Sequence, residues 1–241
     1  MTSAPVESHP LTLGPLLRGE AEVIAGWITR WTAGHTLRLV ALIAAGAGAF
    51  GAAMGSWRAP EQAAFAAVKL PLILLATAAG NALLNGLLAP LLGMDLRLRE
   101  AFAAVLMSFA LAAAILGAFS PLMAFLVWNL PPPVADSTTA VAVHNGLLLT
   151  LVGLIAFAGV TANVLLLQLL KHLGGACVAW RLLLAWLAVN LLLGSQLSWI
   201  ARPFINKAGE PLHFFVPHAL DGSFFVEVAR AVSELWKHFN P

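Results

Sequence analysis

The sequence predicts an all-α fold: a polytopic membrane helix bundle of about five transmembrane helices, with an N-terminal interfacial helix and a short C-terminal helix. Of its 241 residues, 60% are hydrophobic and 10% are charged, and the formal net charge is +2. Soluble domains carry about 25% charged residues, and they do not expose apolar patches larger than a few hundred Å². The composition therefore excludes soluble enzymes and nucleic-acid-binding proteins, and the lipid bilayer is the first partner that we expect.

Residues 1–34 are predicted to form an arm followed by an amphipathic helix. Prolines and a glycine interrupt residues 1–17, which indicates a mobile arm. In residues 18–34, apolar side chains that include Trp27 and Trp31 recur on one helical face. We expect this helix to lie on the membrane with its apolar face down. Packing of the same face against the bundle is the alternative.

Residues 35–201 are predicted to form the transmembrane bundle. In the first span, Ala47, Gly51 and Gly55 recur every four residues. Small residues at this spacing allow a second helix to approach closely, so we expect a helix-packing face there. The five expected spans cover residues 37–56, 70–91, 101–130, 145–170 and 178–200.

Two prolines bear on the shape of these spans. Pro71 is expected in the first turn of the second span, where its missing N–H costs nothing. The third apolar run would be about 45 Å long as a straight helix, whereas the hydrocarbon core is about 30 Å thick. We therefore expect Pro121 to kink or break this helix, and we expect an extended loop over residues 130–140.

The distribution of Lys and Arg between the loops predicts the orientation. Loops that are rich in these residues stay on the cytoplasmic side. The richer loops here follow the second and fourth spans, which places the N-terminus inside and the C-terminus outside. The residues counted are Arg97, Arg99, Lys171 and Arg181 on the inner side, and Arg58 and Lys69 on the outer side.

The sequence contains no pattern that points to catalysis or to metal binding. No charged residue falls in the middle of a predicted span, which argues against ion-coupled transport, because such transporters bind ions with ionisable groups at membrane depth. The histidines are scattered rather than set at helical spacing beside a carboxylate, as a metal site needs. Gly194 and Ser195 are followed by Gln196, so the glycine-flanked turn of a serine nucleophile is not met. We therefore expect no enzyme activity, no metal and no cofactor.

Uncharged polar residues do occur at membrane depth. Those on the second span stand four residues apart and so share one face. They either form hydrogen bonds between helices or line an uncharged path through the bundle, as in a channel. The residues are Thr77, Asn81, Asn85, Asn163, Asn190 and Gln196.

Residues 202–241 are predicted to form a proline- and aromatic-rich segment that ends in a short amphipathic helix around Phe225 to Trp236. The stretch is too apolar to be mobile in water, so we expect it to fold over the outer face of the bundle with its aromatic side chains as anchors. A docking surface for a partner is the alternative. Its distinctive residues are Arg202, Pro203, Phe204, Phe214 and Phe215.

The five-span layout, the short charged turn after the second span and Pro121 together resemble the Yip-type membrane-protein family. In eukaryotes this family implies vesicle traffic and contact with small GTPases. The run from Gly194 to Trp199, followed by Arg202-Pro203-Phe204-Ile205, is similar to an uncharacterised group of bacterial five-span proteins. This resemblance implies a bacterial cytoplasmic (inner) membrane and no established activity. The chain departs from that group at Asn206, where Gly is usual.

We therefore expect a non-catalytic membrane protein that acts as a scaffold or partner-binding subunit of an inner-membrane assembly, with a protein partner or a second copy of itself. The alternative is a channel or facilitator for a small neutral or lipidic solute, lined by the polar residues at depth. The expected contact residues are Trp27, Trp31, Arg202, Pro203, Phe204, Phe214 and Phe215.

Overall fold

The computed structural model describes residues 11–134, 138–206, 208–217 and 219–226. Within these residues the regular structure is entirely helical, which confirms the predicted all-α fold. The helices are α1 (Leu13–Arg18), α2 (Ala21–Thr29), α3 (Ala33–Gly55), α4 (Pro60–Leu91), α5 (Leu98–Trp128), α6 (Thr138–Gly174) and α7 (Ala176–Ile200).

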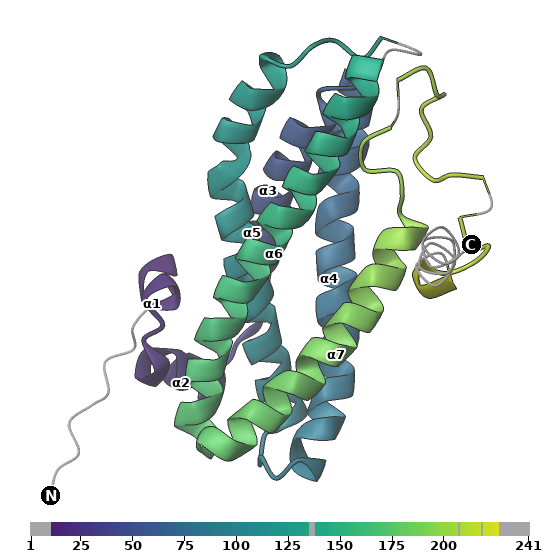
Figure 1. The fold of residues 1–241 in the computed structure, drawn as a ribbon. Coiled ribbons are helices and arrows are strands. Elements are labelled where there is room, and N and C mark those ends of the chain that lie inside the picture. The colour runs from purple at the N-terminus through teal and green to yellow at the C-terminus, as the bar shows by residue number, and fades with distance from the viewer. Residues whose placement is uncertain (1–10, 135–137, 207, 218, 227–241) are drawn as a thin grey trace, which may run out of the picture.

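Helices α3 to α7 are each long and apolar enough to cross a membrane, which confirms the multi-pass architecture. They form one bundle of elongated shape (Figure 1). Helix α3 packs against α4 and α5, α4 also packs against α7, and α6 contacts both α5 and α7. Large apolar side chains such as Leu87, Leu149 and Leu191 remain exposed on the outside. Such extensive apolar exposure is typical of a surface that faces lipid.

Helix α4 begins at Pro60, well before the predicted span, so the expected position of Pro71 in a first turn is wrong. Pro60 at the start of the helix and Glu61 in its first turn favour the earlier start. Pro71 therefore lies inside the helix, where it has no N–H to bond the carbonyl of Ala67. Gly48 of α3 packs near this carbonyl, since a Cβ atom there would lie 3.2 Å from the Ala67 oxygen.

A kink or a break was expected at Pro121. Helix α5 continues through this residue, so the prediction of a break is wrong. Pro121 leaves the carbonyl of Gly117 without its helical donor, but the Ser120 hydroxyl donates to that oxygen at 2.7 Å. Side chains of this kind satisfy carbonyls that a proline frees in membrane helices. Helix α6 already begins at Thr138, so the loop expected over residues 130–140 is shorter than predicted.

Helices α1 and α2 lie against one side of the bundle, near the end where α6 meets α7 (Figure 1). Helix α2 contacts α5 and α6, and its Ile24, Trp27 and Ile28 are buried. Its apolar face therefore packs on the bundle rather than lying open toward the membrane. Residues 13–17 are helical instead of forming a mobile arm, whereas residues 1–10 lie outside the described part.

The chain after α7 is described as far as residue 226. Residues 224–226 are helical, as the predicted C-terminal helix requires. The rest of that prediction lies outside the described residues.

Candidate functional site

The described residues of 202–226, called the C-terminal segment below, lie beside the first half of α4 and the end of α7 (Figure 1). Three side chains donate hydrogen bonds to main-chain carbonyls of this segment. Arg58 donates to Glu210 at 3.0 Å, and Gln62 donates to Phe204 at 2.7 Å. Lys69 donates to the Pro203 carbonyl at 2.9 Å. Non-helical backbone in apolar surroundings needs such donors, because it cannot satisfy its own carbonyls.

Lys69 is the centre of this attachment. Its side chain is 1% exposed, and its Nζ lies 5.0 Å from the ring centre of Phe214 and 5.9 Å from that of Phe215. Phe214 also meets Phe65 of α4 edge to face, with ring centres 5.3 Å apart. The ammonium group is therefore held by a carbonyl and two aromatic rings, which attract a cation through their faces.

Lys69 is predicted from the sequence to lie in an outer loop, and its role in holding the C-terminal segment is not predicted. The signal that would have found it is the pair Pro60-Glu61, which marks a helix start nine residues earlier. With the helix begun there, Lys69 stands seven residues after Gln62 and on the same face. Two long polar side chains two turns apart on an otherwise apolar face indicate a polar contact for another segment.

A second set of contacts ties the segment to α7. The Arg202 guanidinium stacks on the Trp199 ring at 3.6 Å and donates to the Trp199 carbonyl at 2.8 Å. The main-chain N–H of Phe224 donates to the Gln196 side chain at 3.3 Å. Ile205 of the segment is also buried. The segment is thus held by α4 on one side and by α7 at both of its ends.

Large apolar side chains of the C-terminal segment are exposed beside polar ones such as Glu210 and His213. Phe215 is 52% exposed and Leu220 is 77% exposed. These exposed apolar side chains, together called the outer patch below, belong to no long apolar helix. They are Phe215, Leu220, Phe224, Phe225 and Val226.

The predicted contact residues fall into two groups. Trp27 and Trp31 are buried in the bundle, so their side chains are not available to a partner. The contact surface predicted at these two residues is therefore not present. The main-chain carbonyl of Trp31 accepts a hydrogen bond from the Arg99 side chain of α5, so the main chain at Trp31 also contacts the bundle. The second group lies in the C-terminal segment. Its half-buried members take part in the attachment to the bundle, and its one exposed member belongs to the outer patch. The half-buried residues are Arg202, Pro203, Phe204 and Phe214, and the exposed residue is Phe215.

The predicted polar residues at depth are only partly brought together. Asn81, Asn163 and Asn190 line one cavity with a volume of about 10 Å³. Asn85 donates a hydrogen bond to the side chain of Asn81 one turn away, and both are buried. The remaining two lie elsewhere. Thr77 is buried on α4, and Gln196 holds the C-terminal segment.

The small residues of α3 lie against the backbone of α4. A Cβ atom at Gly51 would lie 2.4 Å from the Ala66 oxygen, and one at Gly55 would lie 2.6 Å from the Gln62 oxygen. Ala47 on the same helix is fully buried. No side chain larger than hydrogen fits at the two glycines without a shift, so α3 packs closely against α4, which carries Gln62 and Lys69.

Among the described residues, no group of three or more His, Cys, Asp or Glu side chains is placed to hold a metal ion. Comparison of the chain with protein-family models, with curated proteins and with solved structures finds no match. The resemblance of the C-terminal motif to the bacterial five-span group and to the Yip-type family therefore stays a prediction.

Proposed function

We propose that this chain is a non-catalytic integral membrane protein that acts as a scaffold or partner-binding subunit of an inner-membrane assembly. The observation that carries the proposal is the outer patch. Lipid accounts for the exposed side chains of the long helices, whereas exposed apolar side chains on a segment outside them mark a surface for protein or membrane contact, and the proposal assigns it to a protein. The partner that fits this surface is another membrane protein.

The attachment of the segment supports a binding role. Donors from the α4 side fix the main chain at three carbonyls, and Gln196 fixes one amide. A surface that is already ordered loses less conformational entropy when it binds. Phe215 and its neighbours supply large apolar area at low entropic cost, and aromatic residues are enriched at the core of interfaces.

The proposed location follows from charge and from the resemblance to the bacterial group. Arg97 and Arg99 stand at the end of the bundle that also holds Lys171, whereas Arg58 stands at the opposite end. Since basic residues mark the cytoplasmic side, the proposal places the N-terminus inside. The outer patch then lies on the outer side of the inner membrane.

The proposal is tested by purifying the protein in native lipid patches and identifying co-purified proteins by mass spectrometry. The informative variant carries both Phe224→Ala and Phe225→Ala. The matched control is Phe125→Ala, because Phe125 is equally an exposed phenylalanine but lies on α5. We expect a stoichiometric partner with the unaltered protein and with the control, and its loss with the double variant.

Two results would contradict the proposal, and a third would change the identity of the partner. A homogeneous particle without any partner would remove the scaffold role. A partner that survives the double variant would move its binding surface away from the outer patch. If only a second copy of the chain co-purifies, the partner is the protein itself and not a different protein.

The channel or facilitator is supported by one observation, the asparagines that line a common cavity. Its volume of about 10 Å³ is near that needed for one water molecule on the same measure. A solute with several heavy atoms does not fit. The scaffold is therefore the function that the arrangement supports best.

A further inference from the structure

A small polar cavity lies within the bundle, where four helices meet. Apolar side chains of α5 and α6 complete its wall. Each of the four helices contributes at least one polar side chain. These are Asn81 of α4, Ser108 of α5, Asn163 of α6, and Trp186 and Asn190 of α7.

Trp186 is the group in this wall that most needs a partner. Its side chain is 2% exposed, and its Nε1 has no hydrogen-bond partner among the residues that the structure describes. An indole N–H can only donate, and a buried donor without an acceptor destabilises the fold. A ligand in the cavity that accepts a hydrogen bond would remove this cost.

The neighbouring amides offer complementary groups. The Asn81 oxygen accepts from the Asn85 amide, so the NH₂ group of Asn81 can donate to a ligand. Asn163 donates to the Gly159 carbonyl at 2.7 Å, so its oxygen can accept from one. A ligand in the cavity therefore meets at least two donors, including the Trp186 indole, and one acceptor, beside the polar side chains of Ser108 and Asn190.

The size of the cavity selects the ligand. Its volume is about 10 Å³, and a buried water needs roughly 10–15 Å³ on this measure and two to four polar partners. We propose that the cavity binds one water molecule, which accepts hydrogen bonds from Trp186 and Asn81 and donates one to Asn163. This site gives the asparagines at depth a ligand that the scaffold role does not require.

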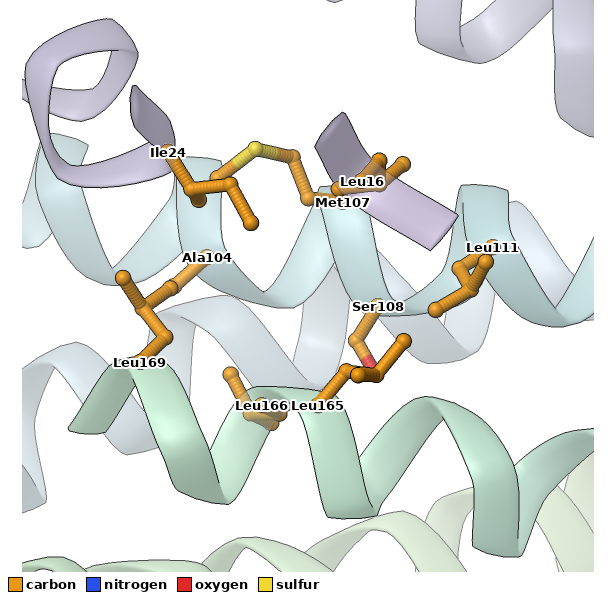
Figure 2. Close-up of a pocket in the computed structure, with 9 residues that line it drawn as sticks. All are labelled: Leu16, Ile24, Ala104, Met107, Ser108, Leu111, Leu165, Leu166 and Leu169. Carbon is orange, nitrogen blue, oxygen red and sulfur yellow. The ribbon is translucent and has the colours of Figure 1, made fainter. Parts of the chain in front are cut away.

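A second cavity provides an internal contrast. It lies between the N-terminal helices and α5 and α6, and its volume is about 20 Å³ (Figure 2). Ser108 is the only polar side chain among the nine that line it. Since Ser108 and Leu166 line both cavities, the two lie on either side of the same pair of residues. The larger cavity offers too few polar partners for a water and should be dry.

The test is solid-state NMR of the full chain in lipid bilayers with ¹⁵N-labelled tryptophan indoles. We expect magnetisation transfer to the Trp186 indole from a water that exchanges slowly with the bulk. The Trp186→Phe variant assigns the signal by its disappearance. An assigned Trp186 signal that receives no such transfer would overturn the proposal.

A second variant locates the water. Asn163→Leu replaces the accepting amide by an apolar group of similar size, so the Trp186 signal should persist while its transfer from water is lost. Asn129→Leu at the end of α5 is the matched control, because that amide bonds the Phe125 carbonyl and does not line the cavity. Transfer that stays complete in Asn163→Leu would place the water elsewhere and refute the site.

Discussion

The two ends of the chain attach to the bundle in opposite ways. Helix α2 near the N-terminus turns its apolar side chains inward, and Ile24 and Trp27 are buried against α5 and α6. The C-terminal segment instead turns main-chain carbonyls inward, toward Gln62 and Lys69, and leaves the outer patch exposed. The N-terminal end thus extends the hydrophobic core, whereas the C-terminal end adds polar contacts to the packing of residues such as Ile205 and keeps apolar side chains exposed.

This difference explains why one attachment is structural and the other suits binding. Burial of apolar area stabilises a fold in proportion to the area removed from solvent. Side-chain donors to carbonyls contribute less net stability but fix the position of the backbone. Substitutions at each end test this difference.

The largest expected effect is that of Trp27→Ala. Loss of a buried tryptophan typically costs about 3–5 kcal/mol of unfolding free energy, so the variant should unfold at clearly lower temperature in lipid nanodiscs. Phe225→Ala is the matched change at the other end, where an exposed side chain should cost less than about 0.5 kcal/mol. Equal losses for the two variants would remove the contrast between the ends.

Lys69→Met should loosen the C-terminal segment. It removes the charged donor to the Pro203 carbonyl but keeps the length of the side chain, and such a hydrogen bond is worth about 1.5–3 kcal/mol. The measurement is the labelling rate of a cysteine introduced by Phe204→Cys in a Cys177→Ser background, which should rise. Lys171→Met, which removes a lysine near Trp180 at the opposite end, should leave the rate unchanged. An unchanged rate in Lys69→Met would show that this lysine does not hold the segment.

Gly51→Ala should push α3 away from α4, the helix whose Gln62 and Lys69 hold the C-terminal segment. Overpacking of this kind typically costs about 1–3 kcal/mol, because the added Cβ would meet the Ala66 oxygen at 2.4 Å. Gly153→Ala is the control, since a Cβ at Gly153 meets nothing within 4 Å. Thermal unfolding of both variants measures the difference, and similar midpoints would argue against a tight contact at Gly51.

Asn85→Ala has the smallest expected effect. It removes one hydrogen bond to Asn81 within the same helix, and even hydrogen bonds between different membrane helices average about 0.6 kcal/mol with a maximum near 1.7. Solute flux in proteoliposomes should not change under the scaffold proposal. A change in flux at unaltered stability would instead favour the channel or facilitator.

The five spans could be predicted because long apolar runs are visible in sequence, and the close glycine contacts of α3 because the spacing of small residues is visible too. The start of α4 could not be predicted from hydropathy, since Lys69 interrupts the apolar run and was assigned to a loop. The carbonyl that accepts a hydrogen bond from Lys69 belongs to Pro203, 134 residues later in the chain. Likewise, the pattern of α2 shows an apolar face but not whether lipid or protein covers it.

The length of α6 has a consequence for the membrane in which the chain is stable. Its 37 residues amount to about 55 Å of helix, and its apolar part over residues 145–170 to about 39 Å, which still exceeds a hydrocarbon core of about 30 Å. Helices that exceed the core tilt, project from it or thicken the bilayer locally, at a cost that rises with each ångström of mismatch. Phe125 and Trp128 are exposed near the C-terminal end of α5, which neighbours α6. We expect these two side chains to lose contact with acyl chains when the bilayer is thin. The unfolding temperature should therefore rise with acyl-chain length, and the chain should partition into the thicker regions of a mixed membrane.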